Sequence, residues 1–290
     1  MTSIHGPVIP RRRLADELRR LREEADVNLD AVAQELMVST SKLSRLENGQ
    51  GSPQPRDVRD LIRYYRIDGT ERAKQLMNWA SAARREGWWT RYVPALTGGL
   101  DVHLAYETEV AVARFYTIPV LPGLLQTERY MRALYERMEA GRPPGELDQL
   151  VKVRLKRQEA LEQRDEDLGP LRLIAVTHES SIHQLVGSAE IMREQLDQLV
   201  ESSRADNIEL RVLPFSVTPP FTSTCMYAHF TFNDEADRDV VSIETHAGFR
   251  FLDTERKVAQ YRAYYDDLYN SSLDAEQTRE LIHKVRTERF

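Results

Sequence analysis

The sequence has a single cysteine, Cys225, among its 290 residues. One cysteine excludes an intrachain disulfide and any zinc site built on two or more thiolates. No run approaches the roughly 18 uninterrupted apolar residues of a membrane-spanning helix, since the richest stretch, Ile118–Leu125, contains two prolines. The first ten residues have no apolar segment of the kind found in signal peptides. These absences predict a cytoplasmic protein with no membrane association.

No catalytic motif in the sequence is complete. His178, Glu179 and His183 lie close together, but the HExxH pattern is absent and the two histidines are not four residues apart. The glycine pair at 98–99 lacks the preceding strand and the following lysine of a phosphate-binding loop, and Cys225 has no nucleophile signature beside it. We therefore expect no metal, no cofactor and no catalytic residues. An enzyme is the weaker hypothesis, which a deep pocket with converging polar side chains would favour.

The composition is that of an ordinary folded protein. Hydrophobic residues make up 41% and charged residues 30%, which excludes disordered and collagen-like chains, and the length favours two domains. The net charge of -6 is divided unevenly: residues 1–85 contain 16 Lys and Arg against 12 Asp and Glu, and the rest contain 24 against 34. A basic N-terminal part, at +4, fits contact with a polyanion, whereas the remainder, at -10, is left for other partners.

Residues 12–84 have the pattern of consecutive short helices. Five helices are predicted: one over 14–25, a second over 28–36, a third over 39–48, a fourth after Pro55 and a fifth from about 70 to 85. Asn28 and Ser39 are suitable N-caps for the second and third helices. About three residues separate these two helices, so they must cross steeply, as in a helix-turn-helix.

The segment from Leu18 to Pro55 resembles the Xre type of five-helix DNA-binding domain found in phage repressors. The resemblance rests on the inward-facing residues, the two helix caps and the Leu-Glu-Asn-Gly ending at 46–49, which occur together at the spacing of that family. Asp26 and Met37 stand where the family usually has glycine. A methionine in a left-handed turn costs on the order of 1 kcal/mol, which the fold should tolerate.

The resemblance implies which residues meet double-stranded DNA. The predicted DNA-binding set is Asn28, Ser39, Thr40, Ser41, Lys42, Ser44, Arg45, Asn48 and Gln50. Because a recognition helix enters the major groove, Thr40, Ser41 and Arg45 are the candidates for base edges, with Arg45 suited to guanine. Lys42, the amides at 48 and 50 and the start of the second helix at Asn28 are candidates for phosphate contacts. The alternative is a polar face that meets only solvent.

Two further groups of charged residues, Arg22 with Glu47 and Arg11–Arg13, could either contact DNA or have no part in DNA binding. In the Xre family, an arginine late in the first helix and a glutamate that closes the third form a partly buried ion pair. We therefore predict a structural ion pair between Arg22 and Glu47, with DNA contact as the alternative. Arg11–Arg13 form a basic arm, which either grips backbone phosphates or is disordered.

The remainder of the chain contains both helical and strand patterns. Helices are predicted over 104–114, 127–140, 147–166 and 188–203, and strands over 171–176, 208–213, 226–232, 240–244 and 249–252. The order of strand, helix and strand over 171–213 predicts a parallel pair. The expected fold class is multidomain: an all-α five-helix Xre-type helix-turn-helix domain, then a larger α/β or α+β domain with a sheet of about five strands. The predicted limits are 1–10 for a flexible N-terminus, 11–85 for the DNA-binding domain and 86–290 for a regulatory, dimerisation or partner-binding domain.

Several stretches of the predicted C-terminal domain resemble a more specific group of regulators. They are Gly87-Trp88-Trp89, Val120 to Glu128, Val153-Arg154-Leu155 with Arg157-Gln158, Met192 to Leu196 and Leu210 to Phe215. Together with the Xre-type domain, they resemble the Scr1-type, antitoxin-like transcriptional regulators of actinobacteria, whose C-terminal domain has no assigned function. The resemblance implies a transcription factor, often encoded beside a gene for a very small partner protein.

The sequence thus predicts a sequence-specific DNA-binding transcriptional regulator that is a homodimer. Its acidic C-terminal domain is expected to dimerise and to receive a small protein partner or a small-molecule effector. The alternative is an antitoxin-like binder of a small toxin-like protein, whose DNA binding is mainly autoregulatory. A neighbouring gene for such a protein would favour the alternative.

Overall fold

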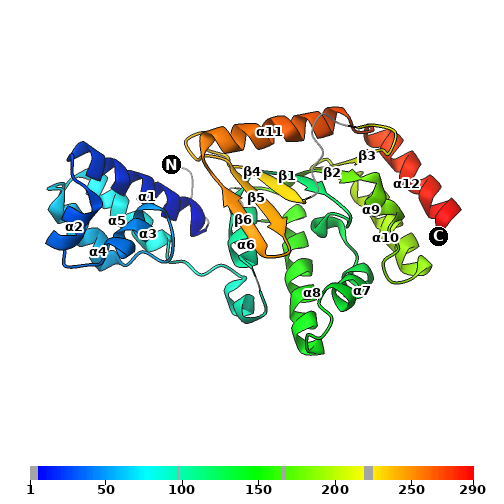
Figure 1. Ribbon diagram of the computed structural model, residues 1–290, viewed down its shortest axis with the longest axis horizontal. Helices are drawn as coiled ribbons and strands as arrows, with labels where there is room; N and C mark the ends of the chain where they lie inside the picture. The colour runs from blue at the N-terminus through cyan, green and yellow to red at the C-terminus, as the bar shows by residue number, and fades with distance from the viewer. Residues whose placement is uncertain (1–5, 97, 165–167, 219–224) are drawn as a thin grey trace. The chain divides into compact units, whose positions relative to one another are not determined.

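The computed structural model describes residues 6–96, 98–164, 168–218 and 225–290 (Figure 1). The chain divides into two compact units, Met1–Thr90 and Arg91–Phe290, which we call the head and the body. The sequence pattern placed this division slightly earlier, after residue 85.

Within the described residues the head consists of five helices, as predicted. They are α1 (Val8–Glu24), α2 (Leu29–Glu35), α3 (Thr40–Glu47), α4 (Pro55–Tyr64) and α5 (Glu71–Ala82). One apolar core joins them, with Leu18 of α1, Val58 of α4 and Leu76 of α5 each at most 1% exposed. The side chain of Thr70 caps α5 by accepting from Ala73 N at 3.1 Å. The helical spacing of apolar residues and the caps therefore predicted the architecture of the head.

The start of the head differs from the prediction. Residues 1–5 lie outside the described residues, and α1 begins at Val8 rather than after residue 10. Val8 is buried, and Pro10 stands in the first turn, where a proline does not interrupt helical hydrogen bonds. Arg11–Arg13 are thus part of a helix and not a separate arm; Arg11 donates to Ala83 O at 3.2 Å.

The body is made of helices and one sheet. Its helices are α6 (Leu100–Glu109), α7 (Glu128–Met138), α8 (Pro144–Gln158), α9 (Glu179–His183), α10 (Ala189–Ser202), α11 (Glu255–Asn270) and α12 (Ala275–Arg289), with short 3-10 turns at Thr90–Ala95, Gly123–Leu125 and Glu159–Leu161. Its strands are β1 (Val112–Thr117), β2 (Arg172–His178), β3 (Ile208–Leu213), β4 (Tyr227–Thr231), β5 (Val240–Thr245) and β6 (Gly248–Leu252).

The sheet, as far as the described residues show, has six strands in the order β3-β2-β1-β4-β5-β6. The strands β1, β2 and β3 are parallel, with Val112 opposite Arg172, and this includes the parallel pair predicted from residues 171–213. From β4 onward the pairing is antiparallel, with Val112 opposite Thr231. β1 is therefore the central strand that joins the parallel and antiparallel halves.

Two sequence predictions for the body were wrong in their limits. The predicted helix over 104–114 ends at Glu109, and β1 begins at Val112, so the sequence predicted one strand too few. Four of the six residues from Val112 to Thr117 are β-branched or aromatic, which favours a strand, but the segment is too short for its periodicity to separate strand from helix. The predicted helix over 147–166 ends at Gln158, and residues 165–167 lie outside the described part.

Helices cover both faces of the sheet. On one face, Tyr116 and Ile174 pack against Tyr265 of α11, which extends across several strands of the sheet in Figure 1. On the other face, the ring of His103 in α6 lies 5.2 Å from that of Phe230 in β4. Cover on both faces agrees with the sequence of β2, in which Leu173–Val176 are apolar without interruption.

The chain also covers part of each outer strand. Phe249 N of β6 donates to Gly98 O at 2.5 Å, and Leu273 N donates to Val212 O of β3 at 2.9 Å. The first contact requires glycine, because a Cβ on Gly98 would lie 2.5 Å from Gly248 Cα. These hydrogen bonds occupy backbone groups that an outer strand would otherwise present to another chain.

A bidentate ion pair between α6 and α8 lies inside the body. Arg157 donates from Nε to Glu107 Oε1 at 2.8 Å and from Nη2 to Oε2 at 2.7 Å. Glu107 is 3% and Arg157 8% exposed. His103, one turn before Glu107, lies 3.6 Å from the same carboxylate and 2.9 Å from Ser242 Oγ of β5. The pair therefore links two helices to the sheet.

Three of the signature stretches seen in the sequence meet beside this ion pair. Gln126, in the loop 120–128, accepts from Arg154 Nη1 of α8 at 2.6 Å. Gln195 of α10 donates to Leu125 O in the same loop at 2.8 Å. Polar side chains of α8 and α10 thus hold the loop 120–128 by hydrogen bonds, which explains the polar residues at 126, 154 and 195.

Candidate nucleic-acid interface

The turn between α2 and α3 has an unusual backbone conformation. Met37 has φ of 52°, in the left-handed region, and its side chain is exposed. Asp26, which precedes α2, has φ of 51°. The two positions at which Xre-type domains usually have glycine are therefore left-handed in this chain, at a cost on the order of 1 kcal/mol for each residue that has a Cβ.

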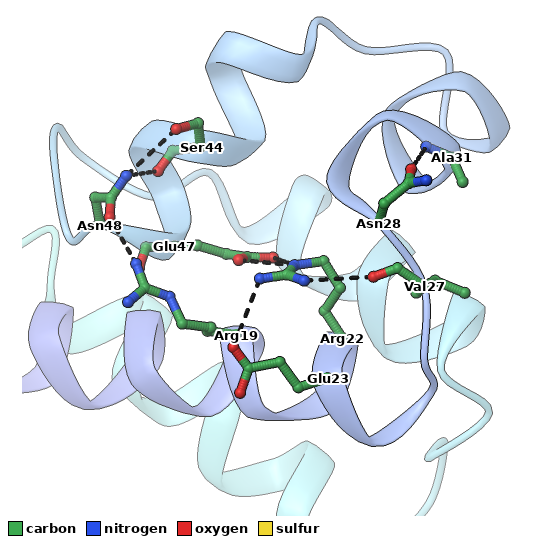
Figure 2. Close-up of polar contacts among 9 residues, drawn as sticks. All are labelled: Arg19, Arg22, Glu23, Val27, Asn28, Ala31, Ser44, Glu47 and Asn48. Atoms are coloured by element: carbon green, nitrogen blue, oxygen red, sulfur yellow. Dashed lines mark hydrogen bonds and ion pairs between the residues drawn. The ribbon is translucent and has the colours of Figure 1, made fainter.

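Asn28 and Ser39 cap the two helices of the motif. Asn28 Oδ1 accepts from Ala31 N at 2.8 Å (Figure 2), and Ser39 Oγ accepts from Lys42 N at 3.3 Å. Each side-chain oxygen thus satisfies one backbone N–H that the first turn of a helix leaves unpaired. The structure gives both residues a role in setting the helix ends, while their contact with DNA stays a prediction.

The outward face of α3 centres on three exposed residues. Ser41, Arg45 and Asn48 are exposed at a spacing of four and three positions, whereas Leu43 and Glu47 point into the head. This spacing places the three side chains in one line along the helix, which we call the reading stripe. The side chain of Arg45 has no hydrogen bond or ion pair to any described residue. Its guanidinium is therefore available to a ligand without first breaking an internal contact.

Carboxylates hold the side chains on both flanks of the reading stripe. On the α2 side, Thr40 Oγ1 lies 2.7 Å from Asp30 Oδ1. On the α4 side, Lys42 Nζ lies 2.7 Å from Asp57 Oδ1. Both carboxylates belong to neighbouring helices, so the pattern of α3 alone gave no signal for them. Lys42, predicted to touch phosphate, has to leave or share Asp57 in order to do so.

The C-terminal end of α3 lies beside a cation that the sequence reading missed. Arg19 of α1 donates to Glu47 O at 3.1 Å and to Asn48 Oδ1 at 2.6 Å (Figure 2). Asn48 Nδ2 in turn donates to Ser44 O at 2.7 Å. A polar hollow of about 360 Å³ opens here. Arg19 adds positive charge at a predicted phosphate contact.

Arg22 and Glu47 lie in direct contact, as predicted. Arg22 Nε donates to the two carboxylate oxygens of Glu47 at 2.9 and 3.0 Å, and Nη1 donates to Val27 O at 3.3 Å. The side chains are 19% and 10% exposed. Burial and the neighbouring Glu47 carboxylate raise the pKa of Tyr65 well above its usual value. The pair lies behind the reading stripe and joins α1 to α3.

Gln50 lies where the chain leaves α3. Its backbone N–H donates to Arg45 O at 2.7 Å, and Gly49 before it has φ of 64°. The side chain of Gln50 is exposed at a hollow of about 310 Å³ that is also lined by Lys42, Arg45 and Asp57. The predicted DNA-binding residues thus occupy one surface of the head, formed by the start of α2, the outer side of α3 and the turn after it.

The histidines considered as metal ligands have other partners. His178 Nδ1 accepts from Ser180 N at 3.2 Å and so caps α9, and His183 Nε2 lies 3.2 Å from Glu179 Oε1. Burial lowers the pKa of His178. Among the residues that the structure describes, no three His, Cys, Asp or Glu side chains are grouped so that they could hold a metal ion. In the same residues, no helix is long and apolar enough to cross a membrane.

Comparison with known families covers most of the chain. Residues 13–75 match the family described as a helix-turn-helix domain. Residues 100–284 match the family described as a domain of unknown function, DUF5753. Neither a search of curated proteins nor a search of solved structures gives a match.

Proposed function

We propose that the chain, which belongs to the family of the domain of unknown function DUF5753, is a sequence-specific transcriptional regulator. The DUF5753 domain follows the helix-turn-helix domain of a DNA-binding regulator. Within this class we assign the chain to the Scr1-type, antitoxin-like group of actinobacteria. It acts in the cytoplasm and binds double-stranded DNA as a homodimer. Its body receives an effector and performs no catalysis. The finer assignments rest on the resemblance of the signature stretches.

The observation that carries the proposal is the reading stripe of α3. Its central side chain, Arg45, is exposed and has no partner among the described residues. A bare guanidinium on the second helix of a helix-turn-helix is placed to donate two hydrogen bonds to guanine in the major groove. Asn48, at the end of the same helix, and Arg19 of α1, which donates to it, are our candidates for contacts with the DNA backbone.

Replacing Arg45 by alanine is expected to weaken binding to the operator by about 1 to 3 kcal/mol and to relax the preference at one base position. The physical reason is the loss of a bidentate contact that no other side chain of α3 supplies. Fluorescence anisotropy against a selected duplex and its single-base variants, at several salt concentrations, measures both effects.

The matched control is Arg63→Ala, which removes the same charge from α4, where the side chain is 65% exposed. We expect this variant to bind within about twofold of the wild type, as is usual for surface changes away from an interface. Equal affinity of the Arg45→Ala variant and the wild type would remove α3 from the interface.

Dimer formation follows from the small size of one head. A single helix-turn-helix reads only a few base pairs, and proteins of this type bind two half-sites about one helical turn apart. We place the dimer contact in the acidic body, which DNA repels. Sedimentation velocity at micromolar concentration should show a dimer. A monomer both with and without operator DNA would refute this part of the proposal.

The body is proposed to receive a small protein or a small molecule that shifts the dimer between two arrangements. An effector changes DNA affinity only by the amount by which it prefers one arrangement, so a 100-fold change needs about 2.7 kcal/mol of differential binding. The antitoxin-like alternative has the same head and differs in what the body binds. Operator affinity measured with and without the product of an adjacent small gene tests the proposal, and we expect the product to change that affinity. No change for that product or for any tested effector would contradict a receiver role.

A further inference from the structure

The hydrogen bond between Thr40 and Asp30 fixes which partner donates. Thr40 Oγ1 lies 2.7 Å from Asp30 Oδ1 at the start of α3. A carboxylate has no proton to donate, so the threonine hydroxyl gives its single hydrogen to Asp30. What remains toward the outside is the lone pairs of Thr40 Oγ1 and of the Asp30 carboxylate. The Thr40–Asp30 pair therefore presents hydrogen-bond acceptors only.

Arg45, further along the same helix, presents donors only. Arg45 has five N–H donors, no acceptor and no partner among the described residues. Lys42, the other cation of α3, is held by Asp57 at 2.7 Å. Thr40 and Arg45 are five residues apart, which is about 7.5 Å along a helix axis. That distance corresponds to roughly two base-pair steps of 3.4 Å.

The Thr40–Asp30 pair and Arg45 fit different base edges in the major groove. Guanine offers only acceptors, N7 and O6, whereas cytosine N4 and adenine N6 carry hydrogen-bond donors. The acceptors of Thr40 and Asp30 can therefore accept from the exocyclic amine of cytosine or adenine. They repel guanine, which also offers only acceptors, and the negatively charged phosphates. Resting on the proposed DNA-binding function, we propose that α3 reads a half-site with cytosine or adenine facing the Thr40–Asp30 pair and guanine facing Arg45 about two base pairs away.

Selection of bound duplexes from a pool with randomised base pairs tests the proposal with the full-length protein. For the wild type we expect guanine at one position and, about two base pairs away, cytosine or adenine preferred over guanine by about tenfold, the size of one specific contact. In the Asp30→Asn variant the second preference should fall at least about fivefold, because the amide can also donate to guanine. Thr40→Val, which removes the hydroxyl, should weaken the same preference and leave the guanine facing Arg45 unchanged.

The control is Glu35→Gln, which removes the same charge from an exposed position of α2 that has no partner among the described residues. This variant should select the wild-type sequence, and thermal unfolding should show that all three variants fold. If Asp30→Asn or Thr40→Val selects the same half-site as Glu35→Gln, the inference is wrong while the proposed function stands. If the wild type enriches no sequence at all, it is the proposed function that fails.

Discussion

Replacing Glu107 by alanine is expected to lower the free energy of unfolding of the body by about 3 to 5 kcal/mol, because it leaves the guanidinium of Arg157 buried without its partner. Arg157 is 8% exposed and donates two hydrogen bonds to this one carboxylate. Urea denaturation followed by far-UV circular dichroism measures the loss. Tryptophan fluorescence reports separately on the head, since Trp79, Trp88 and Trp89 all lie there.

A second measurement on the same variant uses acid. Burial alone would raise the pKa of Glu107, but the attraction and hydrogen bonds of Arg157 outweigh it and lower the pKa from 4.5 to about 2. The ionised carboxylate therefore stabilises the body fully above pH 4.5 and loses this effect as the pH falls toward 2.

In the Glu107→Ala variant this part of the acid dependence should be missing. The control Glu136→Ala, at an exposed position of α7, should change stability by no more than about 0.5 kcal/mol. If the buried and the exposed glutamate have equal effects, the ion pair does not stabilise the body.

Replacing Glu47 by alanine is expected to destabilise the head by about 3 kcal/mol, the lower end of the range for breaking a buried pair. The lower end applies because the Arg22 side chain is still 19% exposed, so water screens part of its charge. The change should shift the tryptophan transition and leave the transition of the body in place. DNA binding should then be lost at the temperature at which the head unfolds.

A double variant separates the cost of an unpaired charge from the value of the pair. Arg22→Met combined with Glu47→Leu removes both charges and fills the space with apolar atoms, which for buried pairs is often neutral or stabilising. We expect the double variant to be more stable than Glu47→Ala alone. Losses that simply add would show that the two residues act independently.

The sequence predicted the head more completely than the body, for a physical reason. Helix limits in the head depend on local signals, and the caps at Asn28 and Ser39 lie where the pattern placed them. β1, by contrast, is a strand because β2 and β4 pair with it on both sides, and these partners lie far away in the sequence. A short apolar run does not reveal such pairing by itself.

In the candidate site, too, some features could be predicted from the sequence and others could not. The exposed residues of α3 follow from helical periodicity, because Leu43 and Leu46 identify its inner side. The carboxylates of Asp30 and Asp57 and the guanidinium of Arg19 come from other helices, so their position depends on tertiary packing. These contacts decide which side chains of α3 are available, and no pattern within α3 contains that information.

The central place of β1 has a consequence during synthesis. Tyr116 of β1 pairs with Tyr227 of β4, so the centre of the sheet cannot close until most of the body has left the ribosome. The five helices of the head lie within the first 90 residues, and all-helical domains fold in about microseconds to milliseconds, whereas chains are extended by about 5 to 20 residues per second. The nascent chain therefore has a folded head many seconds before it has a body. For that interval it is a single helix-turn-helix domain tethered to the ribosome, without a folded body.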